Sequence, residues 1–268
     1  MSENDNSAAS WLVDLAGMLR FFSRLPVPPL HATDDPMQST GFARAARALP
    51  LAGALIALPA ALVLFILSTT ALPAALIALL TLATLVATTG ALHEDGLADV
   101  ADGIGGGWKI ADKLAIMRDS RIGTYGAVVL VLSLLVRAAA LAALIVRYEP
   151  LAAAIALMSA AAVSRLLVAW VSHLLPHARP DGASASFGRP ERAAVLIAST
   201  LTVILLAPLA VTAGAGPTLV AVAGAVAVVA VFARFIRRVL GGQTGDVLGA
   251  SQQLAEIGFL VALLMVAV

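Results

Sequence analysis

Residues 48–92 read ALPLAGALIALPAALVLFILSTTALPAALIALLTLATLVATTGAL, which is 45 consecutive positions without a charged side chain. A helix needs about 20 apolar residues to cross the hydrocarbon core of a bilayer, so this run is long enough for two crossings. Proline interrupts helices, and Pro73 marks the turn between the two halves. We therefore predict a hairpin of two membrane-spanning helices.

The rest of the chain has the same character. A second uncharged run of 41 residues lies between Arg192 and Arg234 and predicts another hairpin, with its turn at residues 213–217. Of the 268 residues, 60% are hydrophobic and 12% are charged, against roughly 45–50% and about 25% in soluble proteins. Further spans are predicted at 124–146, 151–174 and 254–268. The predicted fold is all-α: a polytopic integral membrane helical bundle with six or seven transmembrane helices.

The N-terminal segment is polar and lacks the basic region and apolar core of a secretory signal. We predict a disordered polar tail at 1–10 and a single membrane-embedded domain at 11–268. Residues 11–23 fit either an amphipathic helix on the membrane surface or a short packed helix. The chain has no cysteine, which excludes disulfides and thiolate chemistry, and its net charge of +1 does not suggest a nucleic-acid partner.

Basic residues set the orientation. With a cytoplasmic N-terminus, 14 of the 17 Lys and Arg residues fall on the cytoplasmic side, which predicts active-site loops facing the cytoplasm from the bacterial inner membrane. Arg147 lies on the opposite side. Arg137 and Arg165 lie within spans, where they can snorkel, pair with an acid or touch substrate. Because acids gather on the same side as the bases, the pattern favours an enzyme at the membrane face over a transporter, whose ionisable groups usually lie near the midplane.

The candidate catalytic centre is the segment His93-Glu94-Asp95-Gly96-Leu97-Ala98-Asp99-Val100-Ala101-Asp102-Gly103. Asp95, Asp99 and Asp102 are spaced i, i+4 and i+7, so on a helix they share one face within about 60°. Three like charges on one face repel, and they lie where the C-terminal dipole of a spanning helix would disfavour anions. A hard divalent cation would hold them together, and Mg2+ fits because it combines a few carboxylates with water and phosphate.

Three neighbouring elements add candidate ligands. The glycine-rich stretch 103–107 ends the helix, and it is either a flexible exit or a phosphate contact. Arg118 and Arg121 supply fork-shaped donors suited to pyrophosphate. The stretch 241–250 is predicted as a loop that folds against the aspartates. In it, Asp246 is a candidate fourth metal ligand or a helix cap, and the candidate partners of substrate are Gln243 and Thr244.

Four motifs, in this order, make the chain resemble the cobalamin synthase (adenosylcobinamide-GDP ribazoletransferase) family. They are Phe22 to Pro28, Thr89 to Gly103, Ile116 to Gly126, and Gly241 to Ala250 with Glu256 following. The resemblance runs from about residue 20 to about residue 260. Arg24, in the first motif, is expected to bind substrate. Some members carry an apolar residue where this chain has Glu94, so Glu94 is given no ligand role.

The resemblance implies a membrane-embedded, magnesium-dependent enzyme. Such enzymes join adenosylcobinamide-GDP to α-ribazole, or to its 5′-phosphate, with release of GMP. Asp95, Asp99 and Asp102 would hold magnesium on the pyrophosphate, and a ribose hydroxyl of α-ribazole would attack the phosphorus bonded to cobinamide. His93, a carboxylate, a substrate phosphate or metal-bound hydroxide would take the proton.

Two other functions remain open from the residues alone. One is a CDP-alcohol phosphotransferase-like enzyme, although this chain lacks the Ala-Arg pair of that family, since Val100, Ala101 and Asp102 follow Asp99. The other is a divalent-cation or metabolite transporter. The number of ions stays open, and the expected partners are the two substrates and the lipid bilayer, with a homo-oligomer also compatible with the sequence.

Overall fold

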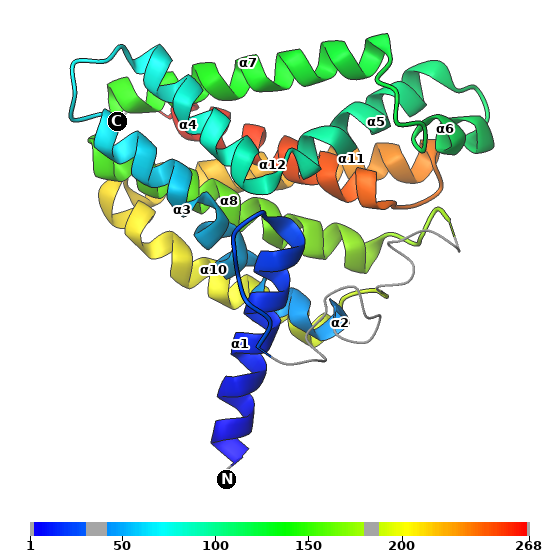
Figure 1. Ribbon diagram of the computed structural model, residues 1–268, viewed down its shortest axis with the longest axis horizontal. Coiled ribbons are helices and arrows are strands. Elements are labelled where there is room, and N and C mark those ends of the chain that lie inside the picture. Colours follow the sequence, from blue (N-terminus) through cyan, green and yellow to red (C-terminus); the bar gives the residue numbers. More distant parts are fainter. Residues whose placement is uncertain (1–2, 31–41, 180–187, 267–268) are drawn as a thin grey trace.

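The computed structural model describes residues 3–30, 42–179 and 188–266, and these residues form a helical bundle (Figure 1). Within these ranges the only β-pairing is an isolated bridge between His177 and Gln243, so the all-α prediction is confirmed. The helices are α1 (Glu3–Phe22), α2 (Phe42–Ala45), η1 (Ala46–Ala48), α3 (Leu49–Leu67), α4 (Ala74–Thr89), α5 (Leu92–Gly106), α6 (Ile110–Ile116), α7 (Thr124–Arg147), α8 (Pro150–Leu174), α10 (Arg192–Thr212), α11 (Ala215–Val239) and α12 (Gly245–Met265).

Six helical segments in the described part are long and apolar enough to cross a membrane. They are Phe42–Leu67, α7, α8, α10, α11 and α12, and α4 with α5 makes a seventh if the bent pair counts as one span. This confirms the prediction of six or seven spans in a multi-pass membrane protein. α8 and α12 are the most buried of the six, so they form the centre of the bundle.

Both predicted hairpin turns are present. Pro73 is the N-cap of α4, directly after the turn that follows α3. The second turn lies between α10 and α11, where Gly214 has φ +97°, a backbone conformation that glycine adopts without steric cost. The last span differs from its prediction. α12 begins at Gly245 rather than near residue 254, because the Thr244 hydroxyl accepts a hydrogen bond from the Val247 N–H and caps the helix there.

The chain bends sharply between α4 and α5. Gly90 and Ala91 are both left-handed, with φ +64° and +59°, and the two helix axes differ by 88°. α5 is therefore a separate helix, set at a steep angle to α4. Asp95 lies in its first turn, where the helix dipole favours an anion. The expectation that the aspartates lie at the C-terminal end of a spanning helix is wrong, because the left-handed pair ends α4 before them.

Helix α1 stands at a steep angle to the bundle, and its C-terminal half packs on the start of the first span (Figure 1). Buried Asp14 pairs with Arg44 at 2.9 Å and with Arg47 at 2.8 Å, and Met18 and Phe22 are buried. Two structures were predicted for residues 11–23, and the one found is the packed helix. α1 begins at Glu3, inside the segment predicted as a disordered tail, and the division of the chain at residue 11 stays a prediction.

Candidate active site

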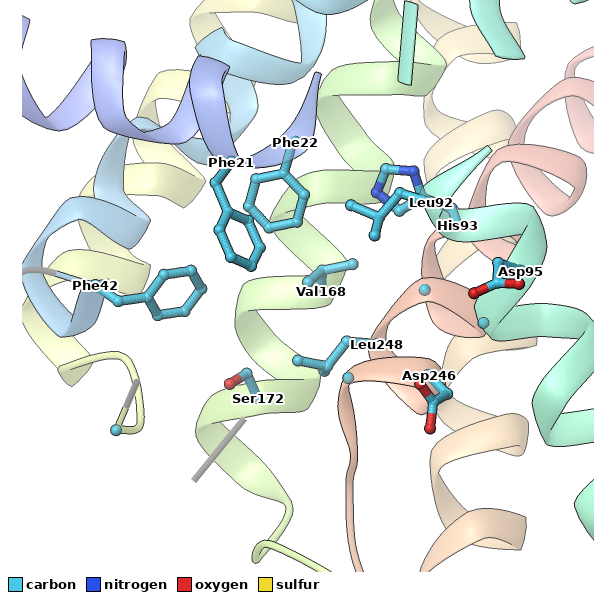
Figure 2. Close-up of a pocket in the computed structure, with 14 residues that line it drawn as sticks. Phe21, Phe22, Phe42, Leu92, His93, Asp95, Val168, Ser172, Asp246 and Leu248 are labelled. Atoms are coloured by element: carbon cyan, nitrogen blue, oxygen red, sulfur yellow. The ribbon is translucent and has the colours of Figure 1, made fainter. Parts of the chain in front are cut away.

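The candidate site forms where the first turns of α5 and α12 meet. Two glycines allow the close approach: a Cβ on Gly96 would lie 2.8 Å from the Asp246 carbonyl oxygen, and one on Gly249 would lie 3.4 Å from the His93 Cα. The contact brings Asp246 to the rim of the same cavity as Asp95 (Figure 2). The expected folding of the 241–250 segment against the aspartates is confirmed, although most of this segment is helical.

The carboxylates in this region repel one another. The pKa of Asp99 is raised to about 7, first by burial and then by the negative charges of Asp95, Asp246 and Asp102. Asp95 is exposed and Asp99 is half-buried, so both are open to a ligand. As they stand, no three acidic or histidine side chains in the described part of the chain converge into a metal site. The charge surplus is nevertheless the kind that a hard cation with water and phosphate ligands relieves.

Asp102 has a different environment from the other two aspartates of α5. Its carboxylate accepts the Gly123 N–H at 2.7 Å and the Gly126 N–H at 2.8 Å, and so caps the N-terminus of α7 from a neighbouring helix. A Cβ on Gly126 would lie 2.2 Å from the Asp102 carboxylate, which explains glycine at this position. The structure thus gives Asp102 a role in the fold, and its role as a metal ligand stays a prediction.

A cavity of about 180 Å3 opens beside Asp95 and Asp246. In Figure 2 three phenylalanine rings lie at one end of the cavity and the two carboxylates at the other, with Val168 and Leu248 between them. The rings belong to Phe21, Phe22 and Phe42. Sequence reasoning missed this aromatic end, because the rings come from two separate helices of the N-terminal region and no periodicity links them.

His93 lines the same cavity. Its ring is stacked on Phe22, with centroids 5.9 Å apart and planes 7° apart, and its buried Nε2 has no hydrogen-bond partner in the described part of the chain. Burial first, and then the charges of Arg165 and Arg137, hold the pKa of His93 well below its ordinary value of 6.5. The imidazole is therefore neutral at neutral pH, which is the form that accepts a proton, although the same burial disfavours the imidazolium that would result.

The predicted substrate arginines lie in different places. Arg121 is bound to Asp119 at 2.6 Å, its side chain is 86% exposed, and it does not line the cavity. Arg24 packs against the bend, since a Cβ on Gly90 would lie 2.5 Å from the Arg24 Nε. Arg118 is exposed at the end of α6.

Arg179 is a basic residue near this site that the sequence did not single out. Burial lowers its pKa first, repulsion from Arg118 adds to the effect, and attraction to Asp246 opposes it, so Arg179 lies within electrostatic reach of both Arg118 and Asp246. Its terminal nitrogen donates to the Leu114 carbonyl, and its buried Nε has no hydrogen-bond partner in the described part of the chain. Arg179 lies in the loop that follows α8, outside the sequence motifs, so no pattern in the sequence marked it.

Gln243 and Thr244 hold the backbone of the site. Gln243 is fully buried, its backbone pairs with Pro176 and Ala178, and its side-chain amide lies 3.0 Å from the His177 Nδ1. Thr244 caps α12, and its hydroxyl lies 3.3 Å from the Asp246 carboxylate. The helix cap is therefore Thr244 rather than Asp246, which leaves the Asp246 carboxylate at the rim of the cavity. Direct contacts of Gln243 and Thr244 with substrate stay predictions.

A buried ionic network links α5 to α7 and α12. Arg137 donates to Glu94 at 2.7 Å and to Glu256 at 2.7 Å, and all three side chains are buried. Gln253 bridges this network by accepting from Arg137 at 2.9 Å and donating to Glu94 at 3.1 Å. The sequence left three roles open for Arg137, and the structure shows that it pairs with acidic side chains. Because Glu94 directly precedes Asp95, the network fixes the rotation of the candidate site helix.

The glycine-rich stretch at the C-terminal end of α5 is explained by packing. A Cβ on Gly103 would lie 2.5 Å from the Met117 side chain, and one on Gly105 would lie 2.5 Å from the Tyr125 ring. These glycines therefore let α6 and the start of α7 pack against α5. A phosphate contact at this stretch stays untested.

Six apolar spans, with acids, arginines and an apolar cavity gathered at one end of the bundle, define a polytopic membrane protein with a polar site at one face. A family model described as cobalamin-5-phosphate synthase matches residues 14–264. The chain belongs to this family and is a transferase of cobalamin biosynthesis.

Similar proteins cover nearly the whole chain. The adenosylcobinamide-GDP ribazoletransferase of Azorhizobium caulinodans is 47% identical over 260 residues, covering 96% of this chain and 97% of the relative. Those of Rhizobium etli and Xanthobacter autotrophicus are each 49% identical, covering 94% of this chain and 96% of the relative. No solved structure matches the chain.

Proposed function

We propose that this protein joins adenosylcobinamide-GDP to α-ribazole, or to its 5′-phosphate, and releases GMP. Its relatives carry the name of that activity at 47–49% identity over nearly their full length. The observation that carries the proposal is the cavity, which combines carboxylates at one end with an apolar, aromatic end at the other. Neither a CDP-alcohol phosphotransferase nor a transporter is supported by the comparisons.

Magnesium is the proposed cofactor. Asp95, Asp99 and Asp246 would hold it, because the repulsion between these carboxylates, which contributes to the raised pKa of Asp99, is what a bound divalent ion would relieve. When bound, the ion would neutralise the pyrophosphate and polarise its phosphorus–oxygen bonds. Asp102 would support this set through the α7 N-terminus.

The chain's own groups would orient the substrates. Arg179 carries positive charge near Asp246, with Arg118 near Arg179, and the two guanidinium groups would bind pyrophosphate oxygens that the acids cannot. The oxygen of a ribose hydroxyl forms a bond to the phosphorus attached to cobinamide, and the bond from that phosphorus to the bridging oxygen breaks as GMP leaves. Neutral His93, on the cavity wall, is the proposed acceptor of the hydroxyl proton.

We place the site at the cytoplasmic face of the inner membrane. Lys109, Lys113, Arg118 and Arg179 gather around α6, at the end of the bundle opposite the C-terminus (Figure 1). Arg147 lies at the other end, where it donates to the Leu264 carbonyl. An excess of basic residues marks cytoplasmic loops, and this asymmetry supports the orientation.

The test is GMP release by protein in membranes supplied with both substrates, with and without Mg2+. We expect activity with Mg2+ and its loss with EDTA. Asp95→Asn should abolish turnover while the protein stays folded, because the Asp95 side chain is exposed at the rim of the cavity. Near-normal turnover in that variant would refute the metal assignment. Accumulation of labelled substrate in sealed vesicles without GMP release would instead support a transporter.

A further inference from the structure

We propose that the aromatic end of the cavity, formed by Phe21, Phe22 and Phe42, binds the dimethylbenzimidazole base of ribazole. This inference rests on the proposed function and deepens it, since it assigns one substrate to one part of the site. The cavity is continuous from these rings to Asp95 and Asp246 (Figure 2).

The size of the cavity selects the occupant. A cavity of about 150 Å3 lined by apolar side chains holds one benzene molecule in another protein. The volume here is about 180 Å3, and the cavity reaches the two carboxylates, so it accommodates a flat bicyclic base with its attached sugar toward them. A corrin macrocycle is several times larger and does not fit. The cobinamide part of the other substrate must therefore lie outside this cavity.

Polarity separates the two remaining aromatic groups, guanine and dimethylbenzimidazole. Guanine carries ring N–H, amino and carbonyl groups, and each such group costs about 1–3 kcal/mol when it is buried without a partner. The glycosylated benzimidazole has no N–H donor and one free ring nitrogen. The rings of Phe21, Phe22 and Phe42 are apolar, as are Val168 and Leu248, and the hydrogen-bonding group drawn beside them is the Ser172 hydroxyl (Figure 2). One hydroxyl can pair with the single free ring nitrogen of the benzimidazole but cannot satisfy the several polar groups of guanine, so this end favours the less polar base.

The arrangement also positions the reaction. With the base among the phenylalanine rings, the ribose extends toward Asp95 and Asp246, where the pyrophosphate would be held. The stacked pair of Phe22 and His93 lines the cavity, with His93 on the side of Asp95 (Figure 2), so the imidazole borders the sugar. The hydroxyl oxygen then forms a bond to the phosphorus attached to cobinamide, and the hydroxyl proton goes to the imidazole. The bond from that phosphorus to the bridging oxygen breaks, and GMP leaves with that oxygen.

Two variants and a control test the assignment. Phe22→Ala removes a wall of the base subsite, and Val168→Phe fills the subsite without removing a ring. Phe65→Ala is the matched control, because Phe65 lies on α3 with 39% of its surface exposed and does not line the cavity. Binding of labelled α-ribazole to the solubilised protein is measured by equilibrium dialysis, and KM is measured for each substrate separately.

Stacking of a base on an aromatic ring contributes about 1–3 kcal/mol, so Phe22→Ala should weaken α-ribazole binding by about 5- to 150-fold. Val168→Phe should weaken it similarly, with KM for adenosylcobinamide-GDP within about twofold of the unaltered protein. Unchanged α-ribazole binding in Val168→Phe would overturn the subsite, even if Phe22→Ala did not fold. A rise in KM for adenosylcobinamide-GDP alone in the Val168→Phe variant would also overturn the subsite. If the unaltered protein binds α-ribazole at the subsite but releases no GMP, the proposed function fails and the subsite stands.

Discussion

The Asp102→Asn substitution should lower the stability of the fold, whereas Asp99→Asn should raise the stability of the metal-free protein and reduce its stabilisation by magnesium. The Asp102 carboxylate accepts two backbone N–H groups at 2.7 and 2.8 Å. Hydrogen bonds to a charged group contribute about 1.5–3 kcal/mol each, and asparagine keeps one acceptor while turning an NH2 toward the other donor. The expected loss for Asp102→Asn is therefore about 2–4 kcal/mol.

For a chain of this size, 1 kcal/mol corresponds to about 2–4 °C in melting temperature, so Asp102→Asn should melt about 4–16 °C lower. The substitution at Asp99 should change the stability in the opposite direction. Its pKa is raised to about 7 in the folded state, so the folded protein favours the protonated form, and this stability is lost as the pH rises through 7. A neutral side chain at position 99 removes that loss.

The assay is thermal unfolding of the purified protein in detergent at pH 8, with EDTA or with excess Mg2+. Asp99→Asn should melt higher than the unaltered protein in EDTA and show a smaller rise with Mg2+. The Asp102→Asn variant should melt at a lower temperature than the unaltered protein both in EDTA and in excess Mg2+. Its melting temperature should still rise when Mg2+ is added. If Asp102→Asn melts normally in EDTA and loses its response to Mg2+, Asp102 is a ligand and the capping argument is wrong.

Four further outcomes follow from the same contacts. Arg137→Met leaves Glu94 buried without its cationic partner and Glu256 with only Arg165 at 3.7 Å, and should cost about 3–5 kcal/mol, which unfolding in detergent measures. Gly90→Ala should cost at least about 1–2 kcal/mol in the same assay, because φ is +64° and the new Cβ would lie 2.5 Å from the Arg24 Nε. Protons compete with Mg2+ at Asp99, so Mg2+ affinity measured by calorimetry should rise from pH 6 to pH 8, and a flat profile would contradict its role as a ligand. Trp108→Cys, at a site 94% exposed in a chain without cysteine, should react with an impermeant maleimide in inside-out vesicles only.

The membrane fold could be predicted because its causes are local. Uncharged runs of 41 and 45 residues require lipid whatever their surroundings, and Pro73 and the 213–217 segment interrupt helices by their own backbone chemistry. The i, i+4, i+7 spacing likewise fixes the three aspartates on one face of any helix that carries them. What the sequence could not give was the direction of that helix, since the 88° bend depends on two successive left-handed residues, one of them Ala91.

The tertiary structure alone decided which side chains share the site. Asp246 reaches the rim of the cavity beside Asp95 because α5 and α12 cross at glycines 153 positions apart in the sequence, and no local pattern encodes that crossing. The same packing turns the Asp102 carboxylate to α7 and gathers the phenylalanine rings. Local sequence thus determined which helices form and which of their faces carry charge. The contacts between helices, which depend on the shapes of both partners, determined which of those charges face a common cavity.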